Sequence, residues 1–584
     1  MRWVPPKPCS STIVSAIATI LPDEADIHLL LRAFVDELVR CGVTDACTSP
    51  GSRSTPLVLA LVRDGRLRCS SHLDERSGGF FALGLAKATR RPVVLACTSG
   101  TAAAEYLPAV VEAHEAGVPL LVLTADRPAE LREVGAGQTI DQLGLYGRAA
   151  RWFFDVGTGH AATPERARWM RSLACRAVWA ASAGARPGPV HLNWPLREPL
   201  VPPAGIGPDP LPGRADGRPW LARPAASPPS SAAALRAALD GARRPLVVAG
   251  RAERDPKLGE AVAAYALALG APLLADPLSG ARRGPAAVAH YDALLRDAGF
   301  AAGHRPDVVL RIGDLPTSKP LRQWLAALDA PQIAFAPEGV WHDPDGALAA
   351  LLPGDPRATL AEAAGPPAAE DGWLRAWTDA DAAAARAIDA TLGPELSEPR
   401  VARELVARLP AQATLVVASS MPVRDVETFA PARDDGGPRV LANRGANGID
   451  GTVSTALGVA VAGARTVLLI GDVALAYDLS GLVSRRRLEL DLTIVVLDND
   501  GGGIFEFLAV AAARDAFEEH VATPPGLDLR SLAATFGLPY GEPTDATALT
   551  AARGLVHVRT DRRANVALHR RVWEAVAAAV RSHP

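Results

Sequence analysis

The stretch Val467-Leu-Leu-Ile-Gly471-Asp472 and a second one about 27 residues later, Val495-Val-Leu-Asp-Asn499-Asp-Gly501-Gly-Gly503, decide the fold of this chain. Each is a short apolar run that ends in polar and glycine residues, which predicts a buried strand followed by a loop. Ligands in an open α/β sheet bind at the carboxyl ends of such strands. Asp472, the Asn499 side chain and the Gly501 carbonyl offer oxygen ligands of the kind that Mg²⁺ requires. We therefore expect them to hold Mg²⁺, or Mn²⁺, on a diphosphate.

Apolar strands alternate with helical stretches on both sides of this region, which predicts parallel sheets covered by helices. We expect strands near 45–48, 92–97, 119–124, 245–250, 307–313, 413–418, 465–470, 492–497 and 554–558. A helix starting near Asp478 would aim its amides at the diphosphate. The expected organisation is a disordered extension (1–26), a first α/β domain (27–200), a linker (201–232), a central α/β domain (233–363), a helical connection (364–398) and a third α/β domain (399–584).

Composition excludes several classes of protein. The 584 residues carry a net charge of -3 and form no basic block, which argues against a nucleic-acid partner. No apolar run reaches the roughly 18 residues of a membrane span. The 6 cysteines include no C-x-x-C pair, which argues against a zinc site or a disulfide framework. These features favour a cytoplasmic enzyme.

The two strand ends, taken together, resemble a known signature, although either one alone is typical of an ordinary turn. The signature is that of thiamine diphosphate (ThDP)-dependent enzymes, G-D-G followed after 25–30 residues by N-N. This chain departs from it at Val473 and Asp500. The resemblance implies three consecutive α/β domains of the pyruvate decarboxylase-like architecture. It also implies active sites between subunits, and hence a homodimer or a homotetramer.

In that family one glutamate contacts the pyrimidine N1′ of ThDP and promotes loss of the C2 proton. Such a glutamate must be buried and oriented near the cofactor. Glu75 is the candidate, because it follows a short predicted strand and precedes the glycine-rich helical segment Gly78-Gly-Phe-Phe-Ala-Leu-Gly84. The alternative is a solvated charge in the run Asp74-Glu-Arg76.

Further strings resemble one branch of the family, the 2-succinyl-5-enolpyruvyl-6-hydroxy-3-cyclohexene-1-carboxylate (SEPHCHC) synthases of menaquinone biosynthesis. The most specific are Thr48-Ser-Pro-Gly-Ser-Arg53-Ser-Thr-Pro-Leu57 and Asn443-Arg444-Gly-Ala-Asn-Gly-Ile449-Asp-Gly451. The branch is a transketolase-type transferase. The resemblance implies that the chain decarboxylates 2-oxoglutarate and adds the resulting succinyl unit to isochorismate in a 1,4 sense, which gives SEPHCHC and CO₂.

Both substrates are dicarboxylates, which favours arginine because its planar fork grips a carboxylate with two hydrogen bonds. The resemblance implies cationic contacts from Arg53, Arg127, Lys319, Arg424 and Arg444. It implies neutral donors at Gln138 and Ser420. It places Ile449 against the cofactor, and Ile504, Phe505 and Leu508 against the isochorismate ring.

Three positions depart from the branch, namely Gly137, Pro320 and Glu506. An inward-pointing carboxylate at Glu506 would repel a dicarboxylate, so we expect it to point away. Two alternatives remain open at this stage. One is another ThDP-dependent 2-keto acid decarboxylase or carboligase, such as an acetolactate synthase. The other is a protein of the same fold that has lost catalysis.

Overall fold

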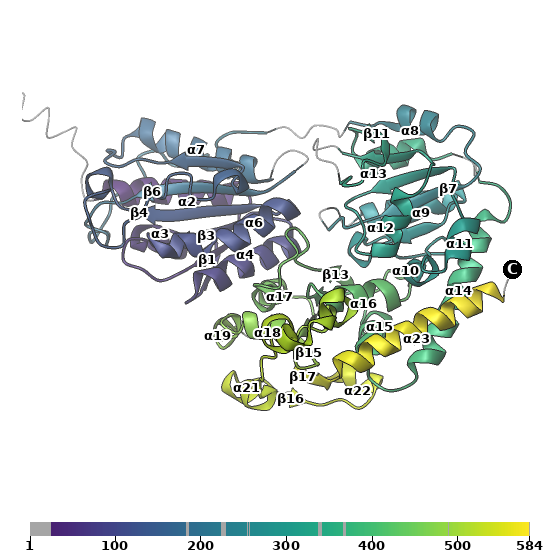
Figure 1. Cartoon of the computed structure of the whole chain (residues 1–584). Coiled ribbons are helices and arrows are strands. Elements are labelled where there is room, and N and C mark those ends of the chain that lie inside the picture. The colour runs from purple at the N-terminus through teal and green to yellow at the C-terminus, as the bar shows by residue number, and fades with distance from the viewer. Residues whose placement is uncertain are drawn as a thin grey trace, which may run out of the picture. The chain divides into compact units, whose positions relative to one another are not determined.

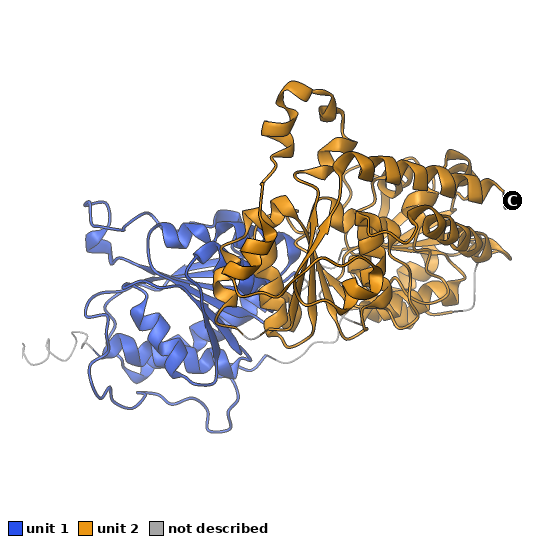
Figure 2. Ribbon diagram, turned by 90° about the horizontal axis from the view of Figure 1, so that it is seen from below, with its two compact units in different colours: residues 1–86, 90–224 blue, residues 87–89, 225–584 orange. Residues whose placement is uncertain are grey.

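The computed structural model describes residues 25–182, 186–223, 229–253, 255, 257–336, 342–365, 369–488 and 490–582. The chain forms two compact units, one of residues 1–86 and 90–224 and one of residues 87–89 and 225–584 (Figure 2). Most of the expected N-terminal extension lies outside the described residues. The finer domain boundaries stay predictions. No helix in the described ranges is long and apolar enough to cross a membrane.

The first unit is built on a six-stranded parallel sheet of order β2-β1-β3-β4-β6-β5 (Figure 1). Its strands are β1 (Asp45–Thr48), β2 (Arg68–Ser71), β3 (Val93–Cys97), β4 (Leu120–Asp126), β5 (Trp152–Asp155) and β6 (Pro189–Pro195). Its helices are α2 (Asp26–Arg40), α3 (Thr55–Arg63), α4 (Glu75–Thr89), α5 (Thr101–Glu105), α6 (Leu107–Ala116) and α7 (Pro164–Ser182).

The apolar stripe of α2 shows why this unit folds as a layered structure. Leu30, Leu31 and Phe34 recur at helical spacing, and all three are fully buried. They join residues of α3, α7 and the strands in one hydrophobic core. Alternate strand residues such as Leu95 and Val122 point to the other face and are equally buried. Both faces of the sheet are therefore covered, as a parallel sheet requires.

The second unit contains two more parallel sheets, of orders β11-β10-β9-β7-β8 and β13-β12-β14-β15-β17-β16. The strands of the first are β7 (Pro245–Ala249), β8 (Leu273–Ala275), β9 (Val308–Ile312), β10 (Gln332–Phe335) and β11 (Leu348–Leu352). Those of the second are β12 (Thr414–Val417), β13 (Arg439–Leu441), β14 (Thr466–Gly471), β15 (Leu492–Asp498), β16 (Tyr540–Gly541) and β17 (Gly554–Arg559). The chain thus holds the three parallel sheets predicted from its sequence.

Helices surround both sheets of the second unit. They are α8 (Ala232–Ala238), α9 (Leu258–Leu269), α10 (Tyr291–Leu294), α11 (Ala298–Gly303), α12 (Lys319–Ala326), α13 (Pro356–Ala363), α14 (Trp373–Leu392), α15 (Glu398–Arg408), α16 (Met421–Phe429), α17 (Thr452–Val461), α18 (Asp472–Tyr477), α19 (Gly481–Arg485), α20 (Arg514–Phe517), α21 (Leu529–Thr535), α22 (Ala546–Ala551) and α23 (Arg562–Arg581). Trp377 of α14 and Val572 of α23 share one core with strands of the central sheet. The two long helices lie side by side (Figure 1).

Two short helices flank Asp478, where the sequence predicts the start of one helix, and the second of them, α19, begins at Gly481. α18 begins at Asp472, directly after β14, and Asp478 is the residue at which it ends. The carboxylate of Asp478 accepts hydrogen bonds from the Ser454 backbone N–H at 2.7 Å and the Ser454 hydroxyl at 3.0 Å. Asp478 therefore anchors the first turn of α17.

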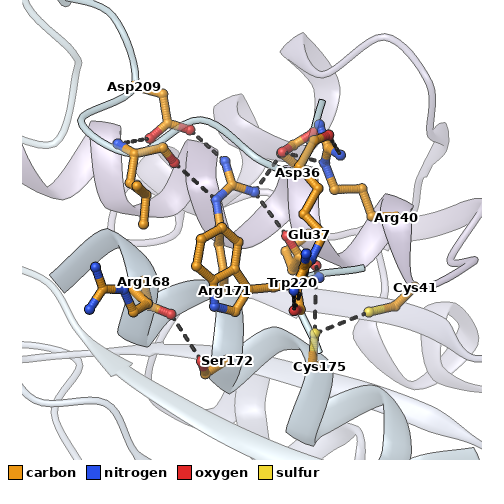
Figure 3. Close-up of polar contacts among 12 residues, drawn as sticks. Asp36, Glu37, Arg40, Cys41, Arg168, Arg171, Ser172, Cys175, Asp209 and Trp220 are labelled. Carbon is orange, nitrogen blue, oxygen red and sulfur yellow. Dashed lines mark hydrogen bonds and ion pairs between the residues drawn. The ribbon is translucent and has the colours of Figure 1, made fainter. Parts of the chain in front are cut away.

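A buried ionic network holds together the outer layer of the first unit (Figure 3). The guanidinium of Arg171 on α7 is fully buried and donates to Asp36 at 2.6 Å and to Glu37 at 2.9 Å, both on α2. It also donates to Asp209 at 2.7 Å, in the segment that follows β6. Glu37 further accepts a hydrogen bond from the backbone N–H of Trp220. Three separate stretches of chain thus depend on one cation.

We predict that Arg171→Leu destabilises the first unit by about 3–5 kcal/mol, because it leaves the buried Glu37 carboxylate without its counter-charge. Urea unfolding of the full chain measures the change. Arg168→Leu is the matched control, since Arg168 lies on the same helix and is exposed. We expect the control to shift stability by about 0.5 kcal/mol or less. Equal effects of the two substitutions would contradict the role given to the network.

Candidate functional site

Two adjacent strand ends meet at one edge of the third sheet. β14 and β15 pair in parallel, with Gly471 opposite Leu497, so that Asp472 and Asn499 emerge side by side. The backbone N–H of Gly501 donates to Asp472 Oδ2 at 2.7 Å. The structure therefore brings together the three residues that the sequence analysis assigns to the metal.

Asp472 is electrostatically suited to a cation. Its side chain is buried, and this burial raises the pKa of the carboxyl to about 6, with the charges of Asp498 and Asp500 adding to the rise. Hydrogen bonds from the Gly501 and Val473 backbones oppose the shift. No lysine or arginine in the described part of the chain forms an ion pair with Asp472. A buried carboxylate without a counter-charge is unfavourable unless a cation joins it.

The Asn499 side chain has an oxygen that is free to bind a cation. Its Nδ2 donates to Glu398 Oε1 at 2.8 Å, whereas its Oδ1 is buried and meets no hydrogen-bond donor among the described residues. The Gly501 carbonyl accepts from the Gly503 N–H at 2.9 Å and keeps a second lone pair. These oxygens fit a hard cation such as Mg²⁺.

Glycine is required twice in the loop that follows β15. Gly501 has a φ of +136°, and a Cβ built on it would lie 2.8 Å from the carbonyl oxygen of Ala522. A Cβ on Gly503 would lie 2.7 Å from Asn499 Nδ2. A side chain at either position would displace the loop or the amide, which explains the glycine run in the sequence.

The buried carboxylate behind this loop was missed by sequence reasoning. Glu398 accepts hydrogen bonds from both Asn499 and Thr560. Burial raises the pKa of Glu398 to about 7, followed by the charge of Asp425. Glu398 belongs to no recognised motif, and its only sequence signal is its place at the start of a helix.

The apolar candidates lie in loops around the same edge. Ile449 is half-buried between β13 and α17, and its carbonyl accepts from the Thr452 hydroxyl at 3.0 Å. Ile504 and Phe505 are half-buried in a short helical turn, Gly503–Phe507, and Leu508 after it is 49% exposed.

The extra carboxylate in this region, Glu506, is neutralised. Its oxygens lie 3.3 Å from Arg514 and 3.7 Å from Arg563. The negative charge at this departure from the family pattern is therefore balanced by two arginines within the same unit.

A second group of predicted residues in this unit is cationic. Burial lowers the pKa of Arg444, and the neighbouring charge of Arg424 lowers it further. Burial also lowers the pKa of Arg424, with Arg322 as the next cause. Within the described ranges none of these three arginines forms an ion pair with a carboxylate. Such a cluster suits an anionic ligand.

Two further candidates for substrate binding in the second unit, Ser420 and Lys319, lie at the starts of helices. Ser420 precedes α16 with a φ of +75°, and its carbonyl accepts from Arg424 Nη1. Lys319 is the exposed first residue of α12, and no hydrogen bond or ion pair in the described residues joins it to Arg424 or Arg444. Arg322 was missed, although it lies one turn after Lys319 and therefore on the same helix face.

Three candidates lie in the first unit. Arg53 is 9% exposed and donates to the Leu196 carbonyl at 2.9 Å and to Glu198 at 3.3 Å. Burial lowers the pKa of Arg127, and the charge of Arg53 is the next cause. The structure thus brings these two arginines together. Gln138, with a φ of +56°, instead donates its side chain to the Ser99 carbonyl at 2.9 Å.

Glu75 begins α4 in the same unit. Asp74 caps the helix by accepting hydrogen bonds from the backbone N–H groups of Arg76 and Ser77. Glu75 is half-buried, and burial raises the pKa of its carboxyl, followed by the charges of Asp74 and Glu105. A carboxyl with a raised pKa suits proton exchange with a weakly basic nitrogen.

Comparison with known proteins matches three family models along the chain. Residues 30–145 match the N-terminal TPP binding domain of thiamine pyrophosphate enzymes, residues 215–417 the middle domain, and residues 429–561 the C-terminal TPP binding domain. TPP is another abbreviation for ThDP.

Relatives similar over most of the chain carry one name, 2-succinyl-5-enolpyruvyl-6-hydroxy-3-cyclohexene-1-carboxylate synthase. The protein from Geobacillus thermodenitrificans is 44% identical over 94% of this chain and 96% of its own. That from Myxococcus xanthus is 43% identical over 97% and 100%. That from Halobacterium salinarum is 44% identical over 88% and 90%. The chain therefore belongs to the thiamine pyrophosphate enzymes and, within them, to the SEPHCHC synthase family.

Proposed function

We propose that this chain joins 2-oxoglutarate to isochorismate, with loss of CO₂, to give SEPHCHC in menaquinone biosynthesis. The observation that carries the proposal is the cluster of Arg322, Arg424 and Arg444, which repel one another and meet no carboxylate ion-pair partner among the described residues. A pocket for an apolar keto acid would not need this charge. The similarity to the named relatives supports the same reaction over an acetolactate synthase-like one.

For the metal we propose Mg²⁺, with Mn²⁺ as the alternative, held by Asp472, Asn499 Oδ1 and the Gly501 carbonyl. The cation would neutralise the buried Asp472 carboxylate and satisfy the unpartnered amide oxygen of Asn499. ThDP, when bound, supplies the electron sink that decarboxylation requires. Glu75 would hold and exchange a proton at the pyrimidine N1′.

The remaining candidates would bind and orient the substrates. Arg53 and Arg127, whose charges influence each other, would bind carboxylate groups from the first unit. Arg424 and Arg444 would do so from the second unit. Lys319, Gln138 and Ser420 would add a charge and neutral donors, Ile449 would support the cofactor, and Ile504, Phe505 and Leu508 would contact the isochorismate ring. The homodimer or homotetramer and the cytoplasmic location stay predictions.

A single assay tests the reaction. Isochorismate is followed in the presence of ThDP and Mg²⁺, with and without 2-oxoglutarate, together with CO₂ release. We expect isochorismate to disappear only when 2-oxoglutarate and ThDP are both present. Decarboxylation of pyruvate, with isochorismate untouched, would overturn the proposed substrates.

We predict that Glu75→Gln lowers the rate of isochorismate loss by at least about 100-fold, because the amide can no longer exchange the proton at N1′. Glu115→Gln is the control, since Glu115 is an exposed carboxylate in the same unit. ThDP binding, measured by calorimetry, is expected to survive the Glu75 substitution. Full activity in Glu75→Gln would require a different acid–base residue.

We predict that Asp472→Asn abolishes Mg²⁺-dependent ThDP binding, because it removes the only anionic ligand of the proposed set. Calorimetric titration of ThDP at increasing Mg²⁺ concentration gives the measurement. Asp491→Asn, an exposed carboxylate at the start of β15, is the control. A chelator should remove activity from the unaltered protein, and added Mg²⁺ or Mn²⁺ should restore it. ThDP binding that is indifferent to both treatments would rule out this metal site.

A further inference from the structure

The side-chain amide of Asn499 has two ends of nearly equal shape and opposite hydrogen-bonding character. Nδ2 can only donate, and Oδ1 can only accept. A metal ion binds the oxygen end alone. Whatever fixes the rotation of this amide therefore decides whether Asn499 can serve as a ligand at all.

One oxygen of Glu398 fixes that rotation. Oε1 of Glu398 accepts from Asn499 Nδ2 at 2.8 Å and from the Thr560 hydroxyl at 2.9 Å. The two donors follow neighbouring strands, β15 and β17, which pair in parallel. An ionised Glu398 carboxylate can only accept hydrogen bonds and has no proton to offer Asn499. Only the nitrogen end of the amide can face it.

The helix start keeps this oxygen in place. Glu398 is the first residue of α15 and is 1% exposed, and Ser397 caps the helix by accepting from the Arg400 N–H. A carboxylate at the first turn of a helix is favoured by the helix dipole. A Cβ at Gly503 would come within 2.7 Å of Asn499 Nδ2, so the glycine leaves the space that the amide fills.

We propose that Glu398 is a positioning residue that holds the Asn499 amide with Oδ1 turned toward the metal ion. The inference rests on the proposed metal role of Asn499. It adds a residue outside the metal ligands, about a hundred positions earlier in the chain, whose loss would free the amide to present its nitrogen instead. Partners behind metal ligands commonly change metal affinity by about 10- to 100-fold when removed.

The first test compares three single substitutions by the Mg²⁺ concentration needed for ThDP binding, measured by calorimetry at pH 8. Glu398→Met replaces the acceptor with an apolar side chain of similar length and should weaken Mg²⁺ affinity by about 10- to 100-fold. Glu398→Gln keeps an acceptor oxygen and should stay within about 3-fold of the unaltered protein. Thr560→Val removes the other hydrogen bond to the same oxygen without touching Asn499, and should also stay within about 3-fold. Equal weakening by Glu398→Met and Thr560→Val would reduce Glu398 to a structural link and overturn the proposal.

The second test uses the symmetry of a carboxylate, which presents an oxygen in either rotation. Asn499→Asp alone should weaken Mg²⁺ binding, because the new carboxylate faces that of Glu398. Combined with Glu398→Met it should recover Mg²⁺ affinity relative to Glu398→Met alone. Combined with Glu398→Gln it should bind more tightly than Asn499→Asp alone, since the introduced amide can donate to the new carboxylate. The comparison of Asn499→Asp with and without Glu398→Gln stays informative if Glu398→Met does not fold.

The outcomes separate the two hypotheses. If the unaltered protein binds ThDP without any need for Mg²⁺, the proposed metal site fails and the role of Glu398 fails with it. If the unaltered protein needs Mg²⁺ but neither double substitution improves on its parent, only the positioning role is overturned. Recovery in both double substitutions, together with weakening by Glu398→Met and not by Thr560→Val, supports control of the amide orientation.

Discussion

The parallel pairing of β14 with β15 is the constraint on which the proposed chemistry of this protein depends. With Gly471 opposite Leu497, the two strands end together, and the polar residues that follow them share one edge of the sheet. A shift of the register by one residue would turn the apolar strand residues to the opposite faces and separate Asp472 from the Gly501 N–H. The buried β-branched residues of both strands therefore fix the geometry of a polar site.

Buried charges without an ion-pair partner in the described chain recur at the sites that we propose for ligands. Asp472 is a buried anion without a cationic partner in the described chain, and Arg424 and Arg444 are cations that repel each other. The buried Arg171, by contrast, forms ion pairs with Asp36 and Glu37. The contrast is physically meaningful, because an unpaired buried charge costs free energy unless a ligand of opposite sign completes it.

Helix packing also places Glu398 beneath the loop that follows β15. α14 and α23 pack in one core with strands of the central sheet and with Phe429 of α16. α15 then begins at Glu398, which places a carboxylate beneath the loop after β15. The same helix that packs against the third sheet thereby supplies the acceptor that orients Asn499. Glu398 thus both begins a packed helix and, in the proposed site, orients a metal ligand.

The sequence alone determined the three parallel sheets, because apolar runs such as those of β1 and β15 are local patterns that a strand must satisfy. The strand expected at 492–497 is found at Leu492–Asp498, and the one expected at 45–48 has those bounds. The motifs around Arg53 and Arg444 likewise identified the family. Tertiary structure decided what depends on contacts between residues of different elements. Examples are the ion pairs of Glu506 with Arg514 and Arg563, and the hydrogen bond of Asn499 to Glu398. Local periodicity carries no signal for such pairs, since their geometry arises only when the elements pack.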